Sequence, residues 1–164
     1  MRHVDKPTVD VELYVEAAPE RIWPLVTDLD LLVSLSDELQ TAKWEPEGGA
    51  PVGRCFVATN RNKYFGEWQT TSTVIEWDEP RSFAWVVGDV TEPNTTWRFS
   101  LRPKGSGTML AQWMRLGTGP SGLTVAIEKM PDKEERIVAG RLVEFRAAMQ
   151  ANLDAIKELA ERPV

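Results

Sequence analysis

Residues 132–160, DKEERIVAGRLVEFRAAMQANLDAIKELA, have the periodicity of one long amphipathic helix. Asp132 followed by Glu135 resembles a capping box at its start, and about 28 residues would span roughly 42 Å. We interpret the Glu134-Glu135 pair as a solvated helix start. Apolar side chains recur at three- and four-residue steps, as expected for a helix that covers one side of a core. This stripe consists of Val138, Leu142, Phe145, Met149, Leu153 and Ile156.

Five segments before this helix alternate apolar and polar side chains, which is typical of half-buried strands. The clearest is residues 95–102, where Trp97, Phe99 and Leu101 share one face. Turn-forming residues separate the segments and no helical pattern intervenes, so we expect the strands to pair as an antiparallel meander. The predicted strands are residues 54–62, 67–77, 81–87, 95–102 and 108–116.

The N-terminal part predicts one strand and two short helices. Residues 8–16 alternate like a half-buried strand. Pro19 suits the first turn of a helix, where its missing N–H costs nothing, whereas Pro24 should kink or shorten that helix. A second short helix is predicted at residues 29–39. No linker or repeat interrupts the chain, so we expect residues 1–164 to form a single domain.

Composition narrows the classes of partner. The chain has 164 residues and a net charge of −6, and no stripe of Lys and Arg stands out, so nucleic acid is not an expected partner. No apolar run is long enough to span a bilayer or resembles a secretory signal, and a cytoplasmic location without membrane insertion is expected. Cys55 is the only cysteine, which excludes an intrachain disulfide. The alternation of its strand predicts that Cys55 lies on the outer face of the sheet and is unreactive.

Seven tryptophans are spread over the chain. They could be bulky core residues. A buried indole N–H needs a hydrogen-bond partner, however, so the wall of a cavity would suit so many indoles better than a dry core.

Catalytic and metal-binding motifs are missing from the sequence. His3 is the only histidine and lies in a terminus that we expect to be frayed, so nucleophile–histidine systems and His/Cys metal clusters are excluded. There is no phosphate-binding glycine motif either. A magnesium site made of carboxylates alone would still be possible, but the Glu134-Glu135 pair is interpreted as a solvated helix start. We therefore expect no cofactor and no metal, and no catalytic residue can be assigned.

Several short motifs occur in an order that resembles a known superfamily. They are APERIW at residues 18–23, TD at 27–28, VGRCF at 52–56 with Asn60, WQTTSTV at 68–74, FAW at 83–85, GT at 107–108 and GPSGL at 119–123. Together they resemble the START-like superfamily, and within it the bacterial polyketide cyclase/dehydrase branch, the SRPBCC proteins. The resemblance covers nearly the whole chain.

The resemblance implies an α+β helix-grip fold. In this fold a curved antiparallel sheet of about seven strands wraps around a long C-terminal helix, with two short helices after the first strand. It also implies one START-like ligand-binding domain with a hydrophobic pocket between sheet and helix. The superfamily includes lipid carriers, cyclases, hormone receptors and chaperone cofactors, so it does not name the ligand.

Strand alternation in the phase of the family predicts the residues that face this pocket. Most are apolar, with a few neutral polar groups that could orient a ligand, as is usual in small-molecule sites. The polar Asn60 and Gln112 could instead make structural hydrogen bonds. The predicted ligand-binding residues are Phe56, Asn60, Trp68, Ser72, Phe83, Trp85, Trp97, Phe99, Leu110, Gln112, Met114, Leu142, Phe145 and Met149.

Three functions remain open. The first is a module, monomeric or homodimeric, that binds an apolar molecule such as a lipid, a steroid or an aromatic polyketide in a cavity of roughly 300 Å³ or more. The second is a polyketide cyclase or dehydratase, which an unpartnered charged residue in the cavity would favour. The third is a protein-interaction module, which a filled cavity and an exposed apolar patch would favour.

The connection before the long helix is expected to contain a further short helix beside the pocket mouth. Leu123, Ile127 and Met130 fall at helical steps after Ser121, a plausible N-cap. Such a segment could act as a lid or could be an ordinary connecting helix.

Overall fold

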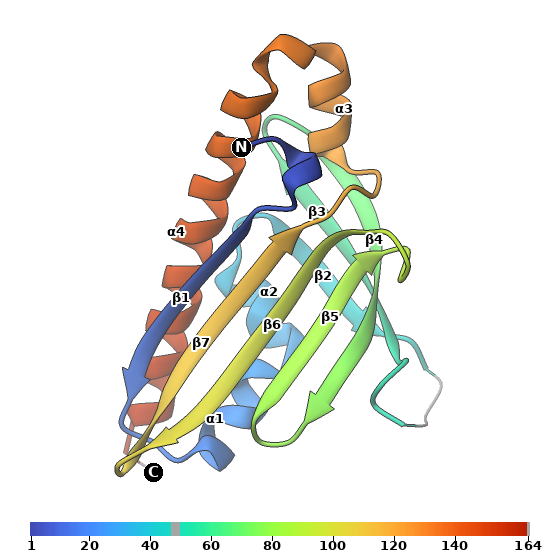
Figure 1. Ribbon diagram of the computed structural model, residues 1–164. Coiled ribbons are helices and arrows are strands. Elements are labelled where there is room, and N and C mark those ends of the chain that lie inside the picture. Colours follow the sequence, from blue (N-terminus) through green and yellow to red (C-terminus); the bar gives the residue numbers. More distant parts are fainter. Residues whose placement is uncertain (47–49, 164) are drawn as a thin grey trace.

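The computed structural model describes residues 1–46 and 50–163, which form a curved seven-stranded sheet with a long helix along one of its faces (Figure 1). Neighbouring strands are antiparallel, in the order β1-β7-β6-β5-β4-β3-β2. The elements are η1 His3–Asp5, β1 Thr8–Val15, α1 Pro19–Val26, α2 Leu29–Leu35, β2 Leu39–Trp44, β3 Cys55–Asn62, β4 Gly66–Asp78, β5 Ser82–Gly88, β6 Pro93–Lys104, β7 Gly107–Leu116, α3 Gly122–Lys129, η2 Pro131–Lys133 and α4 Glu134–Glu161. The α+β helix-grip prediction is confirmed.

The five predicted meander strands and the N-terminal strand are present, with ends that differ by one or two residues. The region after α1 differs more. The predicted second helix ends at Leu35, and residues from Leu39 onward form the edge strand β2 against β3. At Ser36 the backbone turns to an extended conformation, and the Ser36 hydroxyl accepts hydrogen bonds from the Glu38 and Leu39 amides. These bonds end the helix before its apolar pattern ends.

Helix α4 is confirmed at Glu134–Glu161, but its predicted start is wrong in detail. Asp132 lies in η2, and the N-cap Lys133 makes no side-chain capping bond, so the predicted capping box is not formed. Glu134 is buried rather than solvated, because its carboxylate accepts hydrogen bonds from Arg2 Nε at 3.0 Å and from the His3 amide at 3.3 Å. Its Oε1 also lies 3.1 Å from His3 Nδ1. The N-terminus is therefore attached to α4 and not frayed.

Two stripes of α4 face the sheet. The first is the apolar stripe Val138, Met149, Leu153, Ile156 and Ala160, which is at most 2% exposed and fills the core. The second is rotated slightly around the helix and consists of Arg141, Phe145, Ala148 and Asn152, at steps of four, three and four residues. Leu142, predicted to be on the inner stripe, is only half-buried.

Large aromatic side chains close the core at the end of the sheet covered by α1. Trp23 of α1 contacts Trp77 edge to face with ring centroids 5.4 Å apart, and Trp77 contacts Phe83 in the same way at 5.3 Å. This end is filled, whereas open space lies toward the region where α2, α3 and the middle of α4 meet the sheet.

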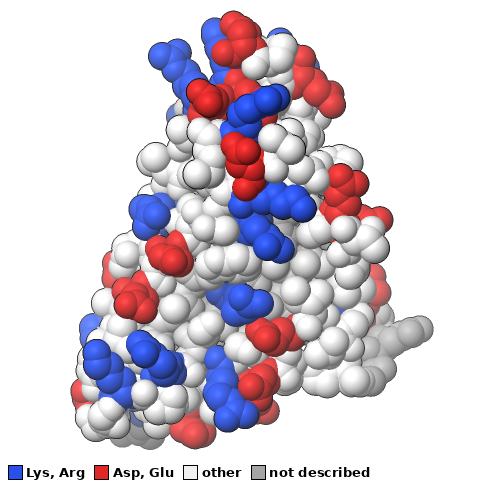
Figure 2. All heavy atoms as spheres, viewed as in Figure 1, with Lys and Arg blue, Asp and Glu red and all other residues white. Residues whose placement is uncertain are grey.

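On the face of the molecule shown in Figure 2, Lys and Arg side chains are interspersed with Asp and Glu and do not gather by sign. The guanidinium carbons of Arg98 and Arg115 lie 5.1 and 5.6 Å from the ring centroid of Trp113. Among residues 1–46 and 50–163, no helix combines the length and the hydropathy that crossing a bilayer requires.

Candidate functional site

A cavity of about 260 Å³ lies between the concave face of the sheet and helices α2, α3 and α4. This volume is slightly below the predicted minimum of roughly 300 Å³. Ten of the fourteen predicted residues line it: Phe56, Asn60, Trp68, Ser72, Trp85, Trp97, Phe99, Gln112, Phe145 and Met149.

The other four predicted residues lie outside the cavity lining. Phe83, Leu110 and Met114 are fully buried in the core, and Leu142 is half-buried on α4. Strand alternation identifies the inward face of a strand but not the position along it. Phe83 has the phase of Trp85, yet it lies nearer to α1, where Trp77 covers it.

Stacked aromatic rings form one wall of the cavity. The rings of Trp85 and Trp97 are nearly parallel with centroids 6.4 Å apart, and Phe145 meets Trp97 edge to face at 5.3 Å. The Trp97 indole N–H donates to the Thr95 hydroxyl at 3.2 Å, which satisfies it inside the apolar wall. Three of the seven tryptophans, Trp68, Trp85 and Trp97, line the cavity.

Neutral polar groups lie between the aromatic residues. Asn60 Nδ2 donates to the Thr70 hydroxyl at 3.3 Å, and Asn152 Nδ2 donates to Gln112 Oε1 at 3.3 Å. Asn60 Oδ1 and Gln112 Nε2 make no further hydrogen bond with the described part of the chain. Both amides thus combine a structural bond with a group that is available to a ligand.

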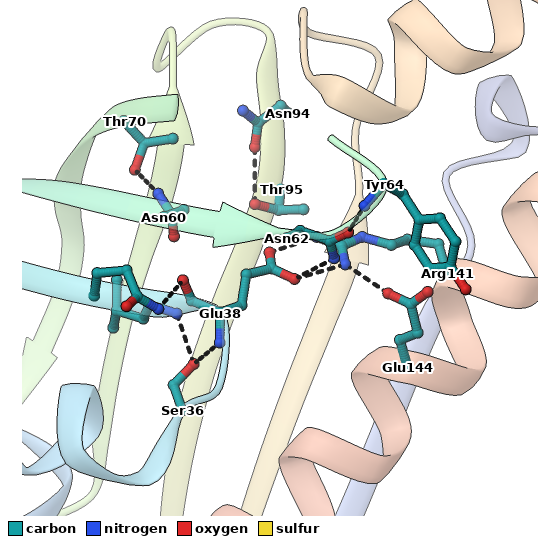
Figure 3. Close-up of polar contacts among 12 residues, drawn as sticks. Ser36, Glu38, Asn60, Asn62, Tyr64, Thr70, Asn94, Thr95, Arg141 and Glu144 are labelled. Atoms are coloured by element: carbon teal, nitrogen blue, oxygen red, sulfur yellow. Dashed lines mark hydrogen bonds and ion pairs between the residues drawn. The ribbon is translucent and has the colours of Figure 1, made fainter. Parts of the chain in front are cut away.

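A charged cluster, Glu38–Arg141–Glu144, forms the side of the cavity next to α4 (Figure 3). Arg141 donates from Nη1 and Nη2 to both oxygens of Glu38, at 2.8 and 2.6 Å, and from Nη1 to Glu144 Oε2 at 2.8 Å. Its guanidinium lies 4.2 Å from the ring centroid of Phe145 and 5.3 Å from that of Phe65. The Arg141 side chain is only 10% exposed.

The fourteen predicted residues include no charged one, whereas the observed lining contains three charged residues, Glu38, Arg141 and Glu144. The lining residues that were not predicted include Glu38, Phe65, Arg141, Glu144 and Asn152. Spacing could have revealed Arg141, because it lies three residues after Val138 and four before Phe145, on the helix face that was predicted to be inward. Because arginine is seldom buried unless it is paired, its charge favoured an exposed position instead.

The ion pair between Glu38 and Arg141 favours the charged forms of these two groups. Burial by itself would raise the pKa of Glu38, but the hydrogen bonds and the positive charge of Arg141, together with the Asn62 amide, outweigh burial and lower the pKa. Burial likewise opposes the charge of Arg141, while Glu38 and Glu144 raise its pKa. Glu38 is thus a carboxylate at neutral pH.

Replacing Glu38 by Gln is expected to destabilise the protein at neutral pH and progressively less as the pH falls. A carboxyl whose pKa is lowered by folding contributes stability above its unfolded pKa, ordinarily 4.5, and this contribution is lost as the pH falls through the folded pKa. Denaturant unfolding of both proteins at about pH 7 and about pH 3.5 measures the difference. A difference that did not change with pH would contradict an ionised, paired Glu38.

The short helix predicted before α4 is present as α3, with Ser121 as its N-cap accepting from the Thr124 amide at 3.3 Å. Ser121 and Leu123 line the cavity, as does Gly122. Phe65, in the turn between β3 and β4, packs so closely on Gly122 that a Cβ there would lie 2.9 Å from its ring. Helix α3 therefore packs against the β3–β4 turn beside the cavity. Its role as a lid stays a prediction.

Comparison with known proteins places the chain among proteins of this architecture. A family model described as polyketide cyclase / dehydrase and lipid transport matches residues 6–161. No curated protein matches the sequence.

Solved structures resemble the chain over nearly its whole length. A polyketide cyclase-like protein from Corynebacterium glutamicum is 25% identical, with a TM-score of 0.69 over 94% of this chain and 91% of that one. A protein from Thermus thermophilus is 18% identical, with a TM-score of 0.62 over 95% of this chain and 100% of that one. The di-domain ARO/CYC protein StfQ of the steffimycin biosynthetic pathway is 16% identical, with a TM-score of 0.69 over 94% of this chain but only 50% of its own length. The likeness to the last two concerns the fold.

Proposed function

Since the chain belongs to the polyketide cyclase/dehydrase and lipid transport family, we propose that it binds an apolar small molecule, lipid-like, steroid-like or aromatic polyketide-like, in the cavity between sheet and α4. Residues 1–164 act as one ligand-binding domain in this proposal. The observation that carries it is a cavity of about 260 Å³ with an aromatic wall, in which the rings of Trp85 and Trp97 are stacked and Phe145 meets Trp97 edge to face. Burial of apolar ligand surface at about 25 cal/mol per Å² supplies the affinity.

Polyketide cyclisation or dehydration is the second candidate function. It is favoured by the family description and by the presence of carboxylates in the cavity. Each charged group of the lining is paired, however, because Arg141 bonds both Glu38 and Glu144. Glu38, whose pKa is lowered by its pairing with Arg141, is a weak proton acceptor at neutral pH, so binding is the better-supported function. The open cavity weakens the case for an interaction module, which was expected to have a filled one.

Binding is tested by titrating the protein with palmitate, cholesterol and hydroxylated polycyclic aromatics while its tryptophan fluorescence is recorded. Because Trp68, Trp85 and Trp97 line the cavity, an occupant should quench or shift their emission. Native mass spectrometry of the purified protein would reveal a molecule that co-purifies. A saturable change with at least one class is expected. No saturable change with any of them would contradict the proposal.

Replacing Thr70 by Phe is expected to weaken binding of any such ligand at least about tenfold. Thr70 lines the cavity, so the new ring would occupy ligand space without adding a tryptophan that complicates the fluorescence. Thr71→Phe is the matched control, because Thr71 is the next residue of β4 and is exposed on the opposite face. Equal affinities of the two variants would place the ligand outside this cavity.

A further inference from the structure

We propose that the Glu38–Arg141–Glu144 cluster selects the ligand by charge, so that the cavity takes a neutral, hydroxyl-bearing aromatic molecule and rejects one that carries a carboxylate. This inference rests on the proposed function and narrows its ligand class. Of the three classes in the titration, it favours hydroxylated aromatics and disfavours fatty acids.

The charge of the lining is the first reason. Among the described residues, the charged groups that line the cavity are one guanidinium, Arg141, and two carboxylates, Glu38 and Glu144. Together they carry a net charge of −1. A carboxylate that entered the cavity would meet this charge in a partly dry environment, where repulsion between like charges is stronger than in water.

Arg141 is not free to compensate an incoming anion. Three of its N–H donors already bond carboxylate oxygens, at 2.6 to 2.8 Å. The rings of Phe65 and Phe145 lie beside its guanidinium. A ligand carboxylate that took these donors would have to displace Glu38 or Glu144, which would leave that carboxylate without its partner.

The cavity instead offers hydrogen-bond acceptors. Glu144 binds Arg141 through Oε2, and its Oε1 makes no hydrogen bond with the described part of the chain. Asn60 Oδ1 likewise makes no hydrogen bond with the described part of the chain. Glu38 Oε2 is already shared between Arg141 and Asn62 Nδ2, which leaves Glu144 as the carboxylate open to a ligand. A hydroxyl group on the ligand would satisfy these acceptors, and the Trp85–Trp97 wall would stack on its rings.

The test compares two molecules that share a ring system, anthracen-2-ol and anthracene-2-carboxylate, by isothermal titration calorimetry near pH 7. The wild-type protein is expected to bind the carboxylate at least about tenfold more weakly. Glu144→Gln, which makes the cluster neutral, should reduce this ratio by about threefold or more. Glu38→Gln/Glu144→Gln, which leaves Arg141 without a carboxylate partner, should bind the carboxylate more tightly than the alcohol.

Glu158→Gln is the matched control. It removes one negative charge from the same helix, but Glu158 is exposed and pairs with Arg162 away from the cavity, so the ratio should not change. If the double variant does not fold, Glu144→Gln decides the question, because the Glu144 side chain is 43% exposed and tolerates the change.

Equal wild-type affinities for the two molecules, or a ratio that Glu144→Gln leaves unchanged, would overturn this inference alone. If neither molecule binds and no other member of the panel does, the proposed function fails and the inference fails with it.

Discussion

Arg141→Met is expected to lower the free energy of unfolding by about 2–3 kcal/mol. Removing one partner of a buried ion pair leaves the other charge without compensation, and here two carboxylates, Glu38 and Glu144, would face each other. Because these side chains are 28% and 43% exposed, water recovers part of the loss, and we expect a value below the usual range for fully buried pairs. Denaturant unfolding measures it.

The control for this prediction is Arg136→Met, an exposed arginine earlier on the same helix. It should change stability by less than about 0.5 kcal/mol. Arg141→Lys should fall between the two, because an ammonium keeps the charge but loses the two-pronged bond to Glu38. Similar losses for Arg141→Met and Arg136→Met would show that the cluster contributes little to stability.

Phe83→Ala is expected to cost about 3–5 kcal/mol, the usual loss when a fully buried phenylalanine is truncated. Phe83 is 0% exposed, lies outside the cavity lining and contacts Trp77 and Trp85, so its removal creates a new void. Phe145→Ala should cost less, about 1–3 kcal/mol, because its ring borders space that is already open.

Arg146→Ala, on the outer side of α4, is the control for the pair. Its side chain is exposed and, within the part of the chain that the structure describes, donates one hydrogen bond, to the Asp10 carbonyl at 3.1 Å, so the loss should be below about 1 kcal/mol. The order Phe83, Phe145, Arg146 in denaturant midpoints is the expected result. Equal losses for Phe83→Ala and Phe145→Ala would mean that Phe145 belongs to a tight core and that the cavity is smaller than the structure indicates.

Comparing Arg141→Met with Arg136→Met, and Phe83→Ala with Phe145→Ala, separates the residues that stabilise the fold from those that form the site. The aromatic core next to α1 depends on close packing, which penalises any lost volume. The cavity next to α3 depends on leaving volume unfilled and on holding charged groups at its side. Phe83→Ala should therefore change stability more than it changes binding.

Periodicity in the sequence was sufficient to predict the fold and most of the cavity wall. Alternation around Trp97 and Phe99 identified the inward face of the meander, and three- and four-residue steps from Val138 to Ile156 identified the inward face of α4. Periodicity works here because one face of each element must be buried, and a shift of one residue in a strand would expose that whole face. Ten of the fourteen predicted residues consequently line one cavity.

The boundary between core and cavity along each face depends instead on tertiary packing. Phe83 lies in the core and Trp85 at the cavity, although both have the same phase, because α1 covers one end of the sheet. Folding also brings Glu38 and Arg141 together across 103 positions of sequence and the His3 side chain to Glu134 across 131. From the local sequence pattern, a charged residue is predicted to be exposed, because burial of a charge is favourable only when a partner is present. These partners come from distant parts of the chain, so only folding shows which charges are paired and lie inside.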